Sequence, residues 1–282
     1  MSLDVEKYKK VLHVDLDNME VVSKINESLW IYIGGVAVSY RLLSDYYEDN
    51  PIIISTGPLA GCFPYISKGN LLFSDNGNLV EKYGGGTFPA FLNFAGYDAI
   101  VIKGNSANNI QVNIGDDITI EQIDGEFDPK DYDLSLSKNA VLSKNYFSFG
   151  DFSDSPLNLK ANIGFKITKS IQKNLFSYYD YENWYTKILD RYKELTVEPR
   201  NNPSCTGCPM GCDFSSAGED NMKISILPRT LISCVFAESI YKDIPLVFGC
   251  LNSVGYDYKH NDLENLPQLF GELKSNLNAK II

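Results

Sequence analysis

Histidine is scarce in this chain, which has only two among its 282 residues. Histidine is the side chain most often used for proton transfer near neutral pH. His13 lies in a segment with strand-like alternation, where a lone histidine is expected to be a satisfied structural group. The sequence assigns no catalytic role to His13 or His260, so it leaves the catalytic residues unknown.

Long apolar runs are also missing. No run approaches the roughly 20 residues that a helix needs to span a bilayer, and residues 1–10 are too charged for a secretory signal. We therefore expect no membrane segment and a cytoplasmic location.

Positive charge is in deficit, since 25 basic residues face 36 acidic ones and the formal net charge is −11. The sequence shows no local basic patch, which argues against a nucleic-acid or anionic-membrane partner. Internal repeats and low-complexity segments do not stand out either. With 44% hydrophobic residues, the chain has enough apolar material for one large domain or two modest ones.

Six cysteines are present, and three of them lie close together at Cys205, Cys208 and Cys212. Thiolates at this spacing in a loop with glycine and proline converge on one soft metal, and a four-iron four-sulfur cluster or a zinc ion both fit. Cys234 and Cys250 are the candidates for a fourth ligand. Both stand in strongly apolar surroundings, which favours buried, inert thiols.

Hydrophobic periodicity predicts an α+β fold. Strands are expected at residues 11–17, 20–23, 51–61 and 99–102, and a strand pair at residues 110–120 around the turn at 115–117. Helical patterns cover residues 26–47, interrupted at Gly34 and Gly35, and residues 88–94 and 178–195. Prolines at 199 and 203 mark the best domain boundary. The sequence therefore predicts an α+β domain over residues 1–200 and a small helical domain over residues 201–282, with helices at residues 227–241 and 261–277.

Gly84, Gly85 and Gly86 form a glycine run directly before the helix expected at residues 88–94. Three residues without a Cβ allow positive φ and let a phosphate or a flat polar heterocycle approach the main chain. A flexible turn is the alternative explanation. The acidic residues at 116–117 and 124–133 have no partner histidine and are expected to form solvated loops.

The words Gly-Gly-Gly-Thr-Phe-Pro at 84–89 and Phe-Ala-Gly-Tyr-Asp-Ala-Ile-Val-Ile-Lys-Gly at 94–104 resemble the N-terminal domain of the aldehyde ferredoxin oxidoreductase family. Further blocks follow the same order at residues 11–16, 32–43 and 51–61. Members of that family are tungsten enzymes with a bis-pterin cofactor. The resemblance implies a first domain of two similar sheet-and-helix halves, followed by a helical domain, with the glycine run lying against the pterin.

The resemblance also implies roles for individual residues. Lys68 stands where the family typically has an arginine that meets the cofactor, although a solvated loop lysine is as good an interpretation. Asp257 ends a Val-Gly-Tyr-Asp segment similar to the family's Leu-Gly-Leu-Asp, whose aspartate lies near a pterin. The loop from Cys205 to Cys212 is similar to the family's cluster loop, which relays electrons between tungsten and ferredoxin.

The chain departs from the family pattern at several of these places. Val36 and the segment at residues 159–164 lack arginines that the family has, and Arg229 follows a proline where the family usually has glutamate. The family's fourth cluster ligand comes from a distant C-terminal domain, and this sequence ends before such a domain.

Two functions are therefore compatible with the sequence. The first is an aldehyde ferredoxin oxidoreductase, in which tungsten or molybdenum held by a pterin oxidises an aldehyde to a carboxylic acid and passes electrons through an iron-sulfur cluster to ferredoxin. The second is a shortened, non-catalytic structural or interaction module that has kept the fold and assembles with a separate C-terminal subunit. We expect a homo-oligomer, and no aldehyde oxidation by the chain alone.

Overall fold

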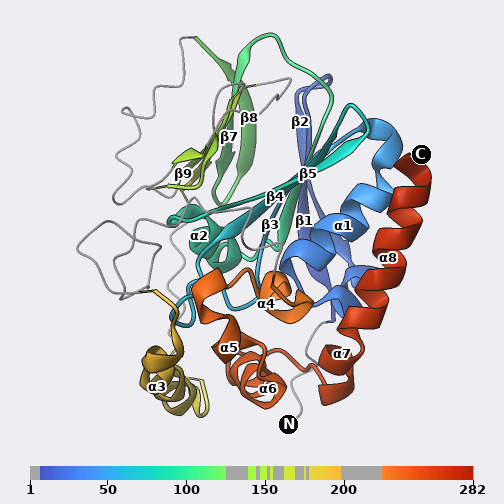
Figure 1. Ribbon diagram of the computed structural model, residues 1–282. Coiled ribbons are helices and arrows are strands. Elements are labelled where there is room, and N and C mark those ends of the chain that lie inside the picture. Colours follow the sequence, from blue (N-terminus) through green and yellow to red (C-terminus); the bar gives the residue numbers. More distant parts are fainter. Residues whose placement is uncertain are drawn as a thin grey trace.

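The computed structural model describes residues 7–124, 139–143, 147–150, 153–154, 162–168, 175, 178–197 and 224–281. These residues form two six-stranded mixed sheets and a helical C-terminal region (Figure 1). The α+β class predicted from the sequence is confirmed.

The first sheet has the order β2-β1-β6-β3-β4-β5. Only the neighbours β1 and β6 run parallel, and every other pair is antiparallel. The last strand of this sheet, β6, thus inserts between the first strand, β1, and the third, β3. The strands are β1 (Lys9–Asp15), β2 (Glu20–Asn26), β3 (Ile52–Thr56), β4 (Gly69–Asp75), β5 (Asn78–Gly84) and β6 (Ala99–Lys103).

The second sheet repeats this topology. Its order is β8-β7-β12-β9-β10-β11, and again only the first and last strands of the half, β7 and β12, pair in parallel. Two similar halves, as the resemblance implied, are therefore present in the strand order. The strands are β7 (Asn109–Ile114), β8 (Ile118–Ile123), β9 (Asn139–Leu142), β10 (Phe147–Ser148), β11 (Ser153–Asp154) and β12 (Ile163–Ile167).

Helices flank the first sheet and make up the C-terminal region. The N-terminal ones are η1 (Glu27–Tyr32), α1 (Gly35–Asp45), η2 (Tyr47–Asp49) and α2 (Phe88–Phe94). The later ones are α3 (Tyr181–Asp190), η4 (Arg191–Glu194), α4 (Ile226–Leu231), η6 (Val235–Ala237), α5 (Glu238–Tyr241), α6 (Ile244–Ser253), α7 (His260–Glu264) and α8 (Leu266–Ile281). None of the helices in the described part of the chain has the length and apolar character that crossing a membrane requires.

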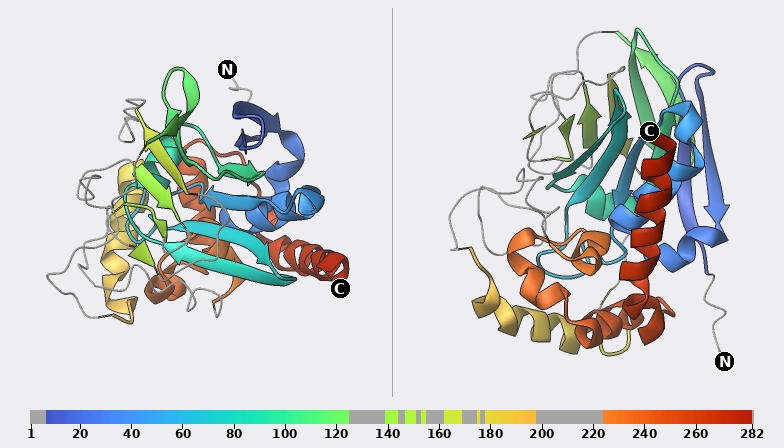
Figure 2. Two further views of the ribbon diagram at one scale, coloured as in Figure 1. Left: turned by 90° about the horizontal axis from the view of Figure 1, so that it is seen from above. Right: turned by 45° about the vertical axis from the view of Figure 1, so that its right-hand side comes forward.

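The first sheet is buried on both faces, because successive residues of its strands enter different cores. Ile53 packs in a cluster with α1 and the C-terminal helices, whereas Ile54 packs in a cluster with α2 and the second sheet. Figure 2 shows the consequence: the second sheet and α8 lie on opposite sides of the first sheet. A strand covered on both faces is apolar throughout, as residues 99–102 are.

The predicted elements are mostly present, with corrections. The helix expected at residues 261–277 is two helices, α7 and α8, and the one expected at residues 178–195 is α3 followed by η4. The helix expected at residues 227–241 is broken into α4, η6 and α5, because Ile232 takes a left-handed conformation with φ of 53°. The strand pair β4–β5 was not predicted, and Gly84 is the last residue of β5 rather than part of a loop. The domain boundary at residue 200 stays a prediction, since it lies outside the described residues.

Candidate functional site

Gly35 and Gly57 form a notch in the helical face of the first sheet, which we call the glycine notch. Gly35 has a φ of +47°, and a Cβ on it would lie 2.2 Å from the carbonyl oxygen of Thr230. A Cβ on Gly57 would lie 1.9 Å from the carbonyl oxygen of Leu231. Real side chains never come this close, so only glycine lets the end of α4 enter the notch.

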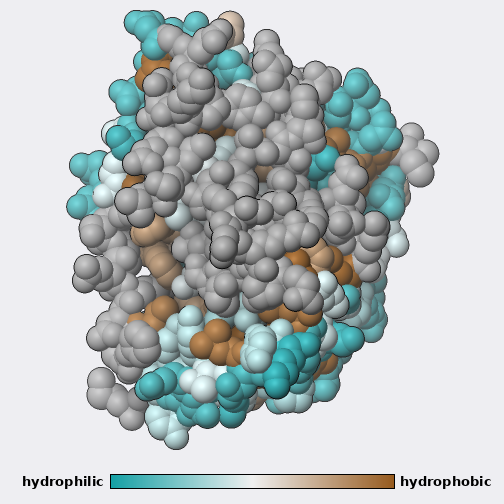
Figure 3. Space-filling model, turned by 60° about the vertical axis from the view of Figure 1, so that its left-hand side comes forward, coloured by the Kyte–Doolittle hydropathy of each residue, from teal (hydrophilic) through white to brown (hydrophobic). Residues whose placement is uncertain are grey.

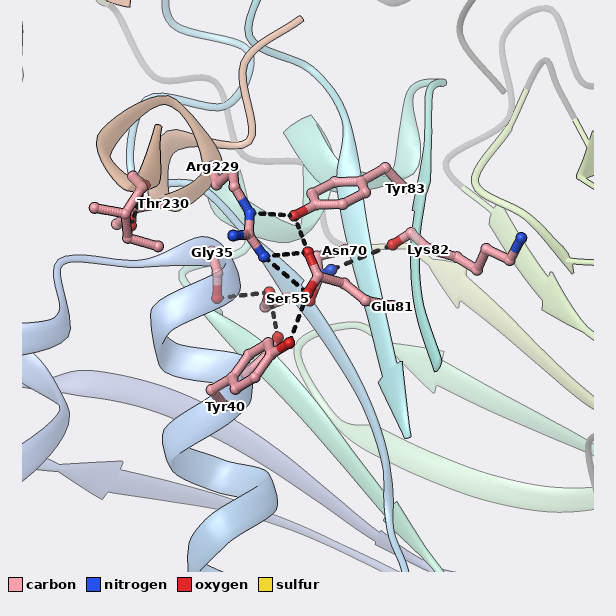
Figure 4. Close-up of polar contacts among 11 residues, drawn as sticks. Gly35, Tyr40, Ser55, Asn70, Glu81, Lys82, Tyr83, Arg229 and Thr230 are labelled. Atoms are coloured by element: carbon pink, nitrogen blue, oxygen red, sulfur yellow. Dashed lines mark hydrogen bonds and ion pairs between the residues drawn. The ribbon is translucent and has the colours of Figure 1, made fainter. Parts of the chain in front are cut away.

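The guanidinium of Arg229, on the same helix, is buried against the first sheet (Figure 4). Its Nη2 donates to both carboxylate oxygens of Glu81 at 2.6 and 2.8 Å, and its Nε donates to the Tyr83 hydroxyl at 3.2 Å. Tyr40 donates to Glu81 at 2.8 Å, and Tyr83 also donates to this carboxylate. All polar atoms of the Glu81 carboxylate are therefore satisfied inside the protein.

This network changes the acidity of its members. Burial acts to lower the pKa of Arg229, but Tyr83 and Glu81 beside it outweigh burial and raise that pKa. Burial, followed by the charge of Glu81, raises the pKa of the Tyr83 and Tyr40 hydroxyls. The arrangement is thus an ion pair flanked by protonated phenols, which suits holding α4 in place rather than transferring protons.

The glycine run is packed against the second sheet. A Cβ on Gly84 would lie 2.8 Å from the Phe147 ring, and one on Gly86, with φ of +136°, would lie 2.2 Å from the carbonyl oxygen of Phe149. That oxygen accepts the N–H of Phe88 at 3.0 Å. The close backbone approach that these glycines allow is thus made by the chain itself, and Gly85 is also buried.

Lys68 is buried, with 2% of its surface exposed, so the alternative of a solvated loop lysine is wrong. Its Nζ has no hydrogen-bond partner among the described residues, and the same holds for the nearby hydroxyl of Ser67 and for that of Ser233. A buried ammonium without an acceptor is costly. Lys68 is therefore the one predicted cofactor residue whose surroundings call for an anion.

Asp257 takes no part in the network of Arg229 and Glu81. Its side chain is 36% exposed and forms ion pairs with Lys7 and Lys259. Hydrogen bonds from Lys259 and then Lys7 lower the pKa of its carboxyl. The structure accounts for Asp257 as a surface ion-pair residue.

The cysteines Cys205, Cys208 and Cys212 lie outside the described residues. Cys250 is fully buried, and burial raises the pKa of its thiol, as expected for an inert cysteine. The described part of the chain contains no group of three or more His, Cys, Asp or Glu side chains that could hold a metal ion. The metal site at the three cysteines stays a prediction.

Sequence reasoning missed the buried network around Glu81. Arg229 was noticed as a departure from the family, but its partner was not. One signal was present: Glu81 stands three residues before the glycine run, among apolar and aromatic neighbours. A carboxylate in such a place needs a buried cation, and the sequence does not say which one.

Comparison with solved structures shows that this fold occurs in a known protein. The active site complex BamBC of benzoyl coenzyme A reductase, solved with 1,5-dienoyl-CoA, matches 95% of this chain with a TM-score of 0.55 and 14% identity. The match covers 61% of that chain. The two-sheet fold with its helical C-terminal region is therefore shared with that complex.

Sequence comparison then identifies the first part of the chain. Residues 11–132 match the family model described as aldehyde ferredoxin oxidoreductase, N-terminal domain, so this region is such a domain. The tungsten-containing aldehyde ferredoxin oxidoreductases of Thermococcus kodakarensis and Pyrococcus horikoshii are 34% and 27% identical over 122 and 125 residues. Each match covers 38% of this chain and spans only 20% of the enzyme's length.

At the described glycines, the close approach is made by the chain's own backbone. Here α4 fills the glycine notch, and Phe149 takes the close approach at Gly86. The cofactor contacts expected of Lys68, Gly84, Gly85, Gly86 and Asp257 remain predictions that the structure does not test.

Proposed function

We propose that this chain is a non-catalytic structural or interaction module built on the aldehyde ferredoxin oxidoreductase N-terminal fold. The observation that supports this most is the position of α4 in the glycine notch, closed by the buried ion pair of Arg229 and Glu81. Where the family usually has glutamate, an arginine is matched here by an internal carboxylate. The pair is therefore an integrated part of the fold rather than a remnant of a site.

The proposal includes assembly with a separately encoded C-terminal subunit. The matched relatives are about five times longer than the stretch that they share with this chain, as the 20% coverage shows. A second subunit is therefore the first candidate partner, and ferredoxin is a further one.

Cofactor content tests the proposal directly. Protein purified without oxygen should contain no stoichiometric pterin, tungsten or molybdenum when measured by metal analysis and pterin fluorescence. Aldehyde oxidation with a viologen acceptor should not exceed background. A bis-pterin and a tungsten or molybdenum ion in each chain, or sustained turnover by the chain alone, would show that the proposal is wrong.

The alternative function is the enzyme itself, and one observation favours it. The buried Nζ of Lys68 has no acceptor among the described residues, as expected if an anionic group were to bind there. The predicted iron-sulfur or zinc site offers a separate check. Replacing Cys208 with serine should abolish iron or zinc binding, whereas Cys62→Ser, which changes a buried thiol in the first domain, should leave it unchanged.

A further inference from the structure

A cavity of about 240 Å³ lies where the starts of β1 and β6 meet the segment that follows α6. Its lining includes four aromatic side chains and one carboxylate. Residues that border it include Tyr8, Trp30, Asp98, Tyr178, Val254 and Tyr256. None of the groups in the Arg229 network borders it.

The volume sets the size of molecule that the cavity accepts. An apolar cavity of about 150 Å³ is enough for benzene. The space here therefore accommodates one substituted ring or two fused rings. Flat ring faces on the walls favour flat aromatic guests, since offset and edge-to-face contacts add to apolar burial.

The charges around the cavity are already balanced. Lys9 Nζ lies 3.2 Å from Asp98 Oδ1, and the same ammonium lies 5.3 Å from the Trp30 ring centroid and 5.0 Å from that of Tyr256. The chain thus supplies its own cation to these rings and to the carboxylate. A charged guest would have to be desolvated without gaining a free counter-charge, so an uncharged guest is favoured.

Asp98 gives the cavity a polar anchor. Its Oδ2 accepts the N–H of Lys10 at 2.8 Å, which fixes the orientation of the carboxylate. Each carboxylate oxygen has two acceptor positions, so Asp98 keeps capacity for one more donor. Small-molecule sites typically combine apolar and aromatic walls with a few placed polar groups, and this cavity has both.

We propose that this cavity binds a small, uncharged aromatic molecule of one or two rings that carries an N–H or O–H donor. The donor meets Asp98, and the ring lies among Trp30, Tyr178 and Tyr256. The site is independent of the proposed function, because it uses none of the residues on which that function rests.

Calorimetric titration of the full chain with 4-methylphenol and with indole tests the proposal. We expect saturable binding of one molecule per chain for at least one probe. Binding of 4-methylcyclohexanol, benzoate and benzylammonium should be about tenfold weaker or absent. Absence of saturable binding for both probes, or equally tight binding of the saturated or charged comparators, overturns the proposal.

Variants locate the site. Val254 borders the cavity and is only half-buried, so Val254→Phe should fill the space and abolish binding without unfolding the chain. Val22→Phe, on a valine of β2 that is 48% exposed, is the matched control and should bind as the parent does. In a Trp184→Phe background, Trp30 is the sole tryptophan, so its emission should respond to the probe.

A second pair of variants covers the case in which Val254→Phe does not fold. Tyr178→Ala removes a ring at the mouth of the cavity and should weaken binding by about tenfold. Tyr179→Ala changes the neighbouring residue, which is 93% exposed, and should have no effect. Unchanged affinity in Tyr178→Ala, or in a folded Val254→Phe variant, places the probe elsewhere and refutes the assignment.

Discussion

At the scale of single residues, the ion pair of Arg229 and Glu81 decides how α4 is held. Both side chains are almost fully buried, with exposures of 10% and 3%. The net contribution of such a pair is small, because desolvation offsets the attraction, but removing one partner leaves a buried charge. The pair is therefore more important for where α4 sits than for total stability.

Replacing Glu81 with glutamine tests this account. The change keeps the shape and leaves the arginine without a counter-charge, so the free energy of unfolding should fall by about 3 kcal/mol. Urea denaturation followed by circular dichroism measures it. Glu20→Gln, on an exposed position of β2, is the control and should stay within about 0.5 kcal/mol of the parent.

The double variant separates charge from packing. Combining Glu81→Gln with Arg229→Met removes the unpaired cation, so stability should recover by more than half of the loss. An unchanged urea midpoint in Glu81→Gln alone would mean that the carboxylate carries no buried charge.

His13 provides the pH dependence at this scale. Burial, followed by Lys24 and Lys103, lowers the pKa of His13 from 6.5 to about 4, and the ring packs 5.2 Å from that of Tyr46. The folded protein thus binds this proton less readily than the unfolded chain. The contribution of His13 is complete above pH 6.5 and is lost as the pH falls through about 4.

The His13→Gln variant isolates this effect. Between about pH 7 and pH 4.5, the urea midpoint of the parent should fall more steeply than that of the variant, while carboxylate titration affects both equally. Parallel curves for the two proteins would exclude His13 as a source of acid sensitivity.

At the scale of elements, two glycines, one after β3 and one within α8, should respond in opposite ways to replacement by alanine. Gly57 lies under α4, and a Cβ there would meet the Leu231 carbonyl at 1.9 Å. Gly271 lies on the exposed side of α8, with nothing within 4 Å of a Cβ. The atoms that a Cβ would meet therefore decide whether replacing a glycine with alanine lowers or raises the free energy of unfolding.

We expect Gly57→Ala to destabilise the protein by about 3 kcal/mol, because α4 must shift to make room. Gly271→Ala should stabilise it by about 1 kcal/mol through helix propensity. Thermal unfolding of the two variants beside the parent measures both. A Gly57→Ala variant as stable as the parent would mean that α4 does not enter the glycine notch.

At the scale of the whole molecule, the first sheet and the C-terminal helices share one core. Buried residues of β3 and α1 pack in the same cluster as those of α6 and α8. On the face shown in Figure 3, hydrophobic residues of the coloured part appear in separate groups between hydrophilic ones rather than as one large patch.

This arrangement predicts one cooperative unfolding transition for the two parts. Trp30 stacks on Tyr258 with ring centroids 4.2 Å apart, and Trp184 packs against Gly249 of α6. Single-tryptophan variants, Trp30→Phe and Trp184→Phe, should each give a fluorescence midpoint equal to the circular dichroism midpoint of the same variant. Two separate midpoints would show that the helical region unfolds as an independent domain.

Local patterns in the sequence were enough to predict the α+β class, the β1–β2 hairpin, α2, β6, and the inert character of Cys250. Periodicity reports which face of an element is apolar, and a turn or a buried thiol leaves a local signature. The family resemblance, carried by residues 84–104, added the two similar halves. The strand pair β4–β5 escaped because its residues are apolar and polar without clean alternation, as both sheet faces are covered.

Only the tertiary structure decided how these elements meet. β6 inserts between β1 and β3, Lys68 is buried, and Arg229 finds Glu81 across 148 positions of the chain. The position of α4 in the glycine notch likewise depends on tertiary packing. Sequence patterns record the polarity of a residue and its neighbours along the chain, whereas the partner of a buried charge or of a bare glycine is set by packing between distant segments.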